Sequence, residues 1–120
     1  MSRILIADDE PHIRKLVSFT LGNRGYEVVE ASDGGEAVRL ARETRPDLIL
    51  LDVMMPELDG FEVCRRLRST PAFATLPVVV ISARTESEAI ERAMQAGANI
   101  YLTKPLRLPD LLNEIEKLLP

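Results

Sequence analysis

The sequence predicts an α/β fold in which a doubly wound parallel sheet is covered by helices on both faces. Short, continuously apolar runs rich in Val, Ile and Leu alternate with longer segments that have helical spacing. Continuous apolarity over so few residues is typical of strands that are buried on both faces, as in a parallel sheet. The alternation gives five β-α units, which form such sheets through right-handed crossovers.

The apolar runs differ in strength, and this difference predicts the strand order. The three strongest runs are Ile4–Ala7, Leu48–Leu51 and Val78–Ile81. Two weaker runs, Tyr26–Ala31 and Asn99–Leu102, contain polar residues and are typical of edge strands. Strands 1, 3 and 4 are therefore expected in the centre of the sheet. The order 2-1-3-4-5 meets this expectation and is the order of flavodoxin-like doubly wound sheets.

Helical segments lie between the predicted strands. Residues with helical spacing, nearly all of them apolar, define one face of the first helix and one face of the last helix. These residues are Ile13, Leu16, Val17, Thr20 and Leu21 in the first helix, and Leu108, Leu111, Leu112, Ile115 and Leu119 in the last.

Residues typical of helix ends predict several helix boundaries. Asp33 with Glu36, and Thr85 with Glu88, have the spacing of capping boxes, which predicts that a helix begins at each pair. The sequence also has prolines suited to first helical positions and glycines suited to helix C-termini. These residues are Pro11 and Pro109, and Gly25 and Gly97.

Composition and charge exclude several classes of protein. The chain has 120 residues, 46% hydrophobic and 28% charged, which is typical of one soluble globular domain. Its 15 Lys and Arg residues and 19 Asp and Glu residues give a net charge of −4, which excludes non-specific binding to nucleic acid. No apolar run approaches the roughly 20 residues that span a bilayer. No signal peptide opens the chain, so we expect a cytoplasmic protein without a membrane partner.

The chain has one cysteine, Cys64, and one histidine, His12. These counts exclude an internal disulfide, a cysteine-cluster metal site and a His-rich zinc site. Cys64 has helical spacing with neighbouring apolar residues, and we expect it to pack in the core. His12 is expected on an exposed helix face, and the cluster of Arg65, Arg66 and Arg68 on a solvated helix face.

Polar side chains stand where the predicted strands end. Asp8 and Asp9 follow the first strand, and Asp52 follows the third. Ser82 ends the fourth strand, and Lys104 ends the fifth. Ligands of doubly wound sheets bind beyond the carboxyl ends of the strands, near the point where the strand order reverses. We therefore expect these five side chains to converge on one site.

The composition of this predicted site indicates phosphate chemistry. Three converging carboxylates repel one another, and a proton or a cation must relieve the repulsion. Oxygen ligands without Cys or His favour a hard cation, and a small number of protein ligands favours Mg²⁺ over Ca²⁺. An added ammonium, a hydroxyl and backbone amides would form a cradle for phosphoryl oxygens. The carboxylate at its centre would be the nucleophile and would form an acyl phosphate.

The motifs that carry these residues together resemble the response-regulator receiver domain. They occur in order and properly spaced over essentially the whole chain, so residues 1–120 are expected to form a single receiver domain. Any one motif alone would be a weak signal, but the set is specific. The motifs are Ile6-Ala7-Asp8-Asp9-Glu10, Asp47–Pro56, Asp59-Gly60, Ser82-Ala83 and Tyr101-Leu102-Thr103-Lys104-Pro105.

The resemblance implies a role for each site residue. Asp52 would accept a phosphoryl group from the phosphohistidine of a sensor histidine kinase or a phosphotransfer protein. Asp9 and Asp52 would bind Mg²⁺ directly, together with the backbone carbonyl of Met54, and Asp8 would act mainly through a water. Lys104 would hold a phosphoryl oxygen, and the peptide bond that follows it would be cis.

The resemblance also implies a conformational switch. Ser82 would move toward the phosphoryl group, and Tyr101 would follow it inward. This movement would remodel the surface formed by the fourth helix, the fifth strand and the fifth helix, where a downstream protein or an output domain would bind and where two copies could dimerise. In physical terms, a new charge would bias an equilibrium between two states.

Two features depart from the family pattern. Asn99-Ile100 replaces a more usual polar or acidic pair, so we expect an apolar Ile100 to be exposed at the partner surface. Met54 and Arg84 occupy positions that tune dephosphorylation in the family. Because a thioether and a long cation are poorly suited to orient an attacking water, we expect a long-lived phosphoryl group.

Three other functions account for parts of the sequence. A phosphatase of the haloacid-dehalogenase type needs a second acid two residues after its nucleophile, where this chain has Met54. A flavodoxin-like FMN carrier needs a phosphate loop rich in hydroxyls and glycine, where this chain has three acids. A degenerate receiver that serves only as an interaction module would not need the intact set of site residues, which is Asp8, Asp9, Asp52, Ser82 and Lys104. We therefore expect a phosphoacceptor signalling domain and not a turnover enzyme, either acting alone or as the N-terminal receiver of a longer protein.

Overall fold

One parallel sheet forms the centre of the computed structural model, which describes residues 2–55 and 58–119. Its strands lie in the order β2-β1-β3-β4-β5, and every neighbouring pair is parallel. The predicted α/β doubly wound fold and its strand order are therefore confirmed. The strands are β1 (Arg3–Ala7), β2 (Glu27–Ala31), β3 (Leu48–Asp52), β4 (Val78–Ser82) and β5 (Ile100–Thr103).

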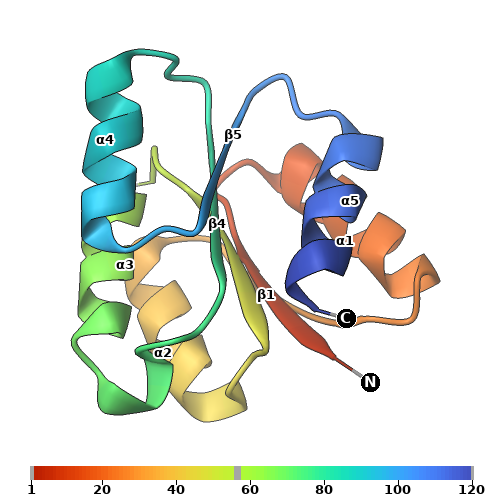
Figure 1. The fold of residues 1–120 in the computed structure, drawn as a ribbon. Helices are drawn as coiled ribbons and strands as arrows, with labels where there is room; N and C mark the ends of the chain where they lie inside the picture. The colour runs from red at the N-terminus through yellow and green to blue at the C-terminus, as the bar shows by residue number, and fades with distance from the viewer. Residues whose placement is uncertain (1, 56–57, 120) are drawn as a thin grey trace.

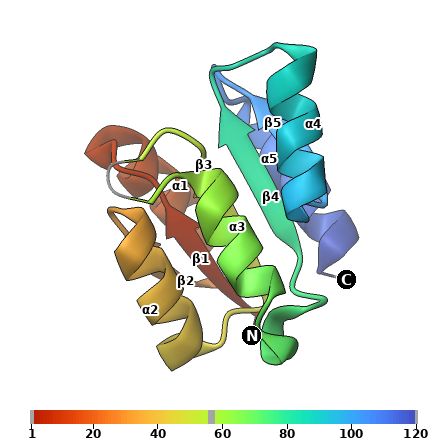
Figure 2. The same cartoon turned by 90° about the vertical axis from the view of Figure 1, so that its left-hand side faces the viewer.

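Helices cover both faces of this sheet. Figures 1 and 2 show α1 and α5 on one face and α2, α3 and α4 on the other. The helices are α1 (Pro11–Asn23), α2 (Gly34–Thr44), α3 (Gly60–Arg68), α4 (Ser87–Ala96) and α5 (Leu108–Leu118), with a 3₁₀ turn η1 (Pro71–Phe73) after α3. Within the described residues, every helix falls short of the length and apolarity that crossing a membrane requires.

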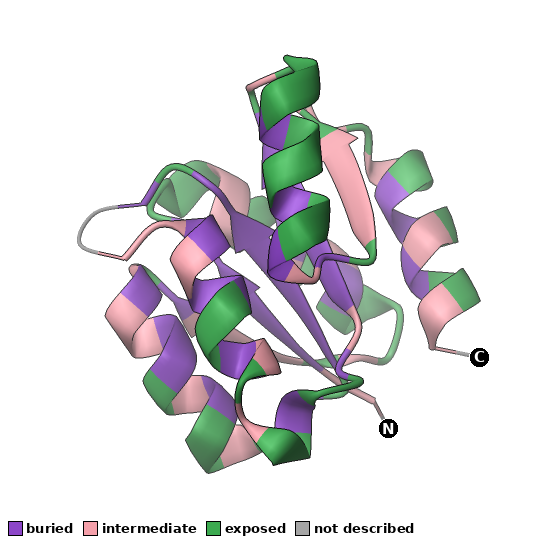
Figure 3. Ribbon diagram, turned by 60° about the vertical axis from the view of Figure 1, so that its left-hand side comes forward, coloured by how far each residue is buried: buried purple, intermediate pink, exposed green. Residues whose placement is uncertain are grey.

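The sheet separates two apolar clusters because alternate residues of a strand point to opposite faces. In β1, Leu5 and Ala7 join the cluster under α2, α3 and α4, whereas Ile4 and Ile6 join the cluster under α1 and α5. Figure 3 shows buried residues along the central strands and partly buried residues in β5. β3 and β4 are buried throughout, as their strong apolar runs predict, whereas the edge strands β2 and β5 are only partly buried.

The N-terminal boundaries of two helices test the predicted capping boxes. The Asp33 carboxylate caps α2 by accepting a hydrogen bond from the Glu36 amide at 2.8 Å, although the Glu36 carboxylate accepts from the Ser32 amide and not from that of Asp33. The box predicted at Thr85 and Glu88 is wrong. α4 begins at Ser87, with Glu86 at the N-cap and no side-chain cap. The first helical hydrogen bonds of α4 run from the Ala89 and Ile90 amides to the Glu86 carbonyl, so Thr85 lies before the N-cap.

Other predicted boundaries agree closely with the structure. Gly25 and Gly97 have φ angles of +89° and +109° at the ends of α1 and α4, a region that glycine adopts readily. Pro11 is the first residue of α1, whereas α5 begins at Leu108, one residue before Pro109.

The buried face of α1 is narrower than its sequence predicts. Leu16 was expected on that face, but 54% of it is exposed, whereas Val17 and Leu21 are fully buried. Helical spacing alone does not fix how much of a helix its neighbours cover, so a residue at the margin of an apolar face can remain in solvent.

Candidate functional site

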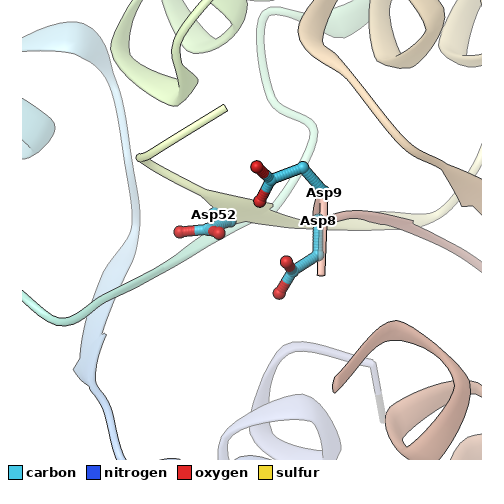
Figure 4. Close-up of side chains that lie close together, drawn as sticks. All are labelled: Asp8, Asp9 and Asp52. Atoms are coloured by element: carbon cyan, nitrogen blue, oxygen red, sulfur yellow. The ribbon is translucent and has the colours of Figure 1, made fainter. Parts of the chain in front are cut away.

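Three carboxylates meet at the carboxyl edge of the sheet, where β1 and β3 lie side by side. Ala7 pairs with Leu51 in the ladder, so the residues that follow β1 lie next to Asp52 at the end of β3. Figure 4 shows the side chains of Asp8, Asp9 and Asp52 close together. One oxygen from each of them lies within 4.8 Å of the others. Asp8 and Asp52 are 2% and 4% exposed, whereas Asp9 faces solvent. The predicted convergence of the three carboxylates is therefore present.

Lys104 supplies the positive charge of the site. Its Nζ donates a hydrogen bond to Asp52 Oδ2 at 3.3 Å and lies 3.7 Å from Asp8 Oδ2 and 3.9 Å from Glu10 Oε2. The Lys104 amide donates to the Ser82 carbonyl at 2.8 Å, which ties the end of β5 to the end of β4. The peptide bond that follows Lys104 is cis, as the resemblance implies.

The charges at the site remain unbalanced, and this imbalance changes two pKa values. Burial and the charge of Asp8 raise the pKa of Asp52 from 3.8 to about 6, although Lys104 and the Met54 amide act in the opposite direction. Burial lowers the pKa of Lys104, but Asp52 and Asp8 outweigh this effect and raise it above its usual value. Three carboxylates thus share one ammonium, an arrangement that an added cation would stabilise.

The donor set fits a hard divalent cation. The three carboxylates offer oxygen ligands, and neither the only histidine nor the only cysteine lies among them. Mg²⁺ prefers oxygen ligands and keeps several waters, which suits a cluster with one solvent-exposed member. The Met54 amide donates to Asp52 Oδ1 at 3.3 Å, whereas the Met54 carbonyl as a metal ligand stays a prediction.

Ser82 and Tyr101 both bind the backbone of Arg84. The buried Ser82 Oγ accepts a hydrogen bond from the Arg84 amide at 3.0 Å, and the Tyr101 hydroxyl donates to the Arg84 carbonyl at 2.7 Å. Tyr101 packs partly buried against the core under α2, α3 and α4. These bonds hold the amide and the carbonyl of Arg84 in the loop before α4. The two proposed switch residues are therefore joined through one residue of the loop.

A cavity of about 510 Å³ lies beside the carboxylates. Met54 and Arg84, the two positions predicted to tune dephosphorylation, line it together with Asp9. Met54 is exposed, and Arg84 Nε pairs with Glu86 Oε2 at 3.0 Å. The guanidinium of Arg92, which the sequence analysis did not single out, also lines this cavity and lies 4.3 Å from the centre of the Phe61 ring.

The prediction that Arg68 is solvated is wrong. This side chain is partly buried and donates hydrogen bonds to the Gly97 carbonyl at 2.8 and 3.0 Å, the Phe73 carbonyl at 2.9 Å and Asn99 Oδ1 at 2.9 Å. Its position at the end of α3 next to the end of α4 depends on tertiary packing, which a helical charge pattern does not reveal. Arg65 and Arg66 are exposed, as predicted.

The remaining expectations concern three other residues. His12 is exposed, and Cys64 is buried in the core, as predicted. Burial raises the pKa of the Cys64 thiol, which makes this cysteine unreactive. Ile100 is not an exposed residue, contrary to the expectation. It is partly buried against the cluster under α1 and α5 because the alternation of β5 turns it toward that face.

Comparison with known proteins assigns the family. A family model described as "Response regulator receiver domain" matches residues 4–116. The chain belongs to the response regulator receiver domain family. It is 43% identical over 119 residues to the DNA-binding dual master transcriptional regulator RpaA of Synechocystis and 45% identical over 117 residues to the response regulator MprA of Mycobacterium leprae. These matches cover 99% and 98% of this chain but 49% and 50% of the relatives, so the receiver chain spans about half of their length.

Solved structures of receiver domains have the same fold. Chemotaxis protein CheY4 of Vibrio cholerae has 35% sequence identity and a TM-score of 0.94, and the match covers 99% of both chains. The receiver domain of a sensor histidine kinase from Pseudomonas aeruginosa has 32% identity and a TM-score of 0.89, and the match covers 97% of this chain and 95% of that one. That structure holds a magnesium ion coordinated in its active-site cleft. This chain is therefore a receiver domain of a two-component response regulator.

Proposed function

We propose that this receiver domain is a phosphoacceptor switch in which Asp52 takes a phosphoryl group from a phosphohistidine donor. The observation that carries the proposal is the position of Asp52, a buried carboxylate 3.3 Å from the Lys104 ammonium and next to two further carboxylates. A solvated surface aspartate would need neither the lysine nor the acidic neighbours. The donor would be a sensor histidine kinase or a phosphotransfer protein, and residues 1–120 would act as one domain.

Mg²⁺ is the cofactor that fits this site. We expect Asp9 and Asp52 to bind it directly with the Met54 carbonyl, and Asp8 to act mainly through a water. The magnesium ion in the related Pseudomonas receiver domain supports this assignment. When bound, Mg²⁺ would neutralise negative charge on the phosphoryl oxygens, which is the main requirement of phosphoryl transfer.

The chain's own residues would position the reacting groups. An Asp52 carboxylate oxygen forms the new bond to phosphorus while the bond from phosphorus to the donor imidazole nitrogen breaks. The electron pair of the broken bond stays on that nitrogen, which takes up a proton. The Lys104 ammonium exchanges its ion pair with Asp52 for one with a phosphoryl oxygen. The negative charge of the new phosphoryl group is thus partly neutralised by a residue that already lies in the site. Ser82 would supply a hydroxyl to another phosphoryl oxygen.

The phosphoryl group would change the loop before α4. Ser82 Oγ now accepts from the Arg84 amide, and a turn of Ser82 toward the phosphoryl group would break that bond. Since Tyr101 binds the carbonyl of the same residue, the two side chains would move together. The surface of α4, β5 and α5 would then favour a downstream protein, an output domain or a second copy. This is a shift between two states, biased by a new charge.

The proposal makes the chain a signalling partner and not a turnover enzyme. Met54 is exposed and apolar where a haloacid-dehalogenase-type phosphatase needs its second acid, which argues against that alternative. We do not propose direct binding to nucleic acid or membranes. The printed name of RpaA includes DNA binding, but that protein is about twice as long as this chain. The cytoplasmic location stays a prediction.

Intact-mass measurement tests the proposal. The chain is incubated with acetyl phosphate, with and without Mg²⁺, beside the variants Asp52→Asn and Asp110→Asn. We expect a gain of one phosphoryl group that requires Mg²⁺, occurs in Asp110→Asn, where the changed residue is exposed on α5, and is absent in Asp52→Asn. If rapid quenching detects no gain in the unmodified chain, the phosphoacceptor proposal is wrong and the chain is an interaction module that does not need phosphorylation.

A further inference from the structure

Arg14 on α1 forms hydrogen bonds with two residues near the three carboxylates, Asp8 and Glu30. Its Nη1 donates a 2.7 Å hydrogen bond to the backbone carbonyl of Asp8, and its Nε donates to Glu30 Oε1 on β2 at 3.0 Å. Only 14% of the Arg14 side chain is exposed. A largely buried guanidinium that donates to two fixed acceptors is held in one orientation, so it ties the end of β1 to the Glu30 carboxylate.

The Arg14 bond completes the hydrogen bonding of Asp8. The Asp8 amide donates to the Ala31 carbonyl at 3.1 Å, and Asp8 Oδ1 accepts from the Glu10 amide at 2.8 Å. With its carbonyl held by Arg14, the peptide plane between Asp8 and Asp9 cannot rotate freely. Because that plane sets the direction of the Asp9 side chain, the Arg14 bond also orients the exposed carboxylate of the cluster.

Glu30 neutralises the charge of Arg14. It accepts a hydrogen bond from Arg14 and also lies 3.1 Å from Lys15 Nζ, the ammonium of an exposed side chain. Burial opposes the ionisation of Glu30, but the bonds from Lys15 and Arg14 outweigh it and lower the pKa of Glu30 below its usual value. The ionised Glu30 therefore lies beside a cation that would otherwise repel a metal ion at the carboxylates.

We propose that Arg14, held by Glu30, is a positioning residue that sets the geometry of Asp8 and Asp9 for binding a divalent cation. This inference rests on the proposed function, since it assigns the cation to the same three carboxylates. It goes further because it assigns a role in cation binding to Arg14 and Glu30, which would not contact the cation themselves. Residues that orient metal ligands typically change metal affinity about 10-fold or more when they are removed.

The direction in which Mg²⁺ affinity changes when Arg14 is replaced distinguishes a positioning role from a purely electrostatic one. Removal of a positive charge near an acidic site strengthens cation binding if the charge acts only through its field. Removal of a positioning residue weakens binding despite the lost repulsion. Lys15 provides the matched control because it also pairs with Glu30 but has no hydrogen bond to Asp8 among the described residues.

Calorimetric titration of the full chain with MgCl₂ tests the proposal. We expect Arg14→Met to raise the Kd for Mg²⁺ about 10-fold, while Lys15→Met leaves it within about twofold or lowers it. The amide resonances of Asp9 and Glu10 should shift in Arg14→Met even without Mg²⁺. An equal or lower Kd for Arg14→Met overturns the inference. If the unmodified chain itself fails to bind Mg²⁺, the proposed magnesium site is wrong.

A second variant covers the case in which Arg14→Met does not fold. Arg14→Lys keeps the positive charge but cannot reach both the Asp8 carbonyl and Glu30 with a rigid fork. We expect its Kd for Mg²⁺ to rise several-fold, because the geometry is lost while the charge is kept. A Kd equal to that of the unmodified chain would show that only the charge at this position matters and would overturn the inference.

Discussion

The burial of Asp52 and the negative charge of its neighbour Asp8 reduce the stability of the folded chain. A carboxyl group with a pKa of 3.8 in the unfolded chain and about 6 in the folded chain binds protons more strongly when folded. The neutral Asp52 carboxyl therefore adds to the free energy of unfolding below pH 3.8, and this added stability is lost as the pH rises through about 6. At pH 7 the ionised Asp52 thus destabilises the folded chain.

The first prediction follows from the destabilising effect of the ionised Asp52 at pH 7. Asp52→Asn should raise the free energy of unfolding at pH 7 by about 1–3 kcal/mol, because it removes a buried charge next to Asp8. The gain should fall below about 1 kcal/mol at pH 4, where the native carboxyl is already protonated. Urea unfolding at both pH values without Mg²⁺ measures it, with the exposed Asp110→Asn as control. A variant that is no more stable at pH 7 would contradict the prediction.

The second prediction concerns the lifetime of the phosphoryl group. Met54 and Arg84 line the cavity beside the carboxylates, and the Met54 thioether, a weak hydrogen-bond acceptor, is poorly suited to orient a water. We expect the phosphorylated chain to last minutes or longer once the donor is removed. Met54→Asn should shorten this lifetime several-fold because an amide can hold a water, whereas Met94→Asn, at an exposed position on α4, should not. Intact-mass decay measures both, and loss within seconds in the unmodified chain contradicts the prediction.

Single residues differ in how far the sequence predicts their place. The acids and Lys104 were predictable because the ends of parallel strands share one edge of the sheet, so position in the chain gives position in space. Arg14 and Arg68 were not predictable in this way. Each is a charged residue on a helix, and only the packing of that helix against β2 or α4 turns its side chain from solvent to a backbone carbonyl.

At the scale of elements, α3 begins close beneath the end of β3. The Gly60 amide donates to the Val53 carbonyl at 3.0 Å, and a Cβ at Gly60 would lie 2.5 Å from the Asp52 carbonyl oxygen. Since that oxygen belongs to the backbone, the clash cannot be relieved by a side-chain rotation. The first residue of α3 therefore controls the backbone that presents Asp52.

The third prediction tests this contact. Gly60→Ala should lower the free energy of unfolding by about 1–3 kcal/mol because the added methyl group overpacks the end of β3. Gly22→Ala in α1 is the matched control, since a Cβ there meets no atom within 4 Å. It should raise stability by about 0.5–1 kcal/mol, the usual helix preference for alanine. Urea unfolding compares both variants, and equal effects would contradict the account of Gly60.

The elements also show why boundaries are harder to predict than strands. The strands follow from the strength of their apolar runs, which is a local property. The start of α4 is fixed by the Glu86 carbonyl, which accepts the first helical hydrogen bonds from the Ala89 and Ile90 amides, and no side chain caps it. A capping pattern such as Thr85 with Glu88 offers one possible N-cap, whereas the backbone hydrogen bonds begin one residue later, at Glu86.

At the scale of the whole molecule, the phosphoacceptor Asp52 lies at the carboxyl end of the central strand β3. The proposed partner surface lies across α4, β5 and α5. The connection between them is short, because Ser82 and Tyr101 meet at the backbone of Arg84. Phosphorylation at Asp52 should therefore reach the partner surface through the loop before α4. The cluster under α1 and α5 should change little.

Hydrogen exchange of the whole chain, measured by mass spectrometry with and without acetyl phosphate and Mg²⁺, tests this central claim most directly. We predict that exchange changes in residues 82–90 and 99–103 on phosphorylation, stays constant in β1 and β3, and does not change in Asp52→Asn. A chain that gains the phosphoryl group on Asp52 but shows the same exchange in those two segments would contradict the account of the switch.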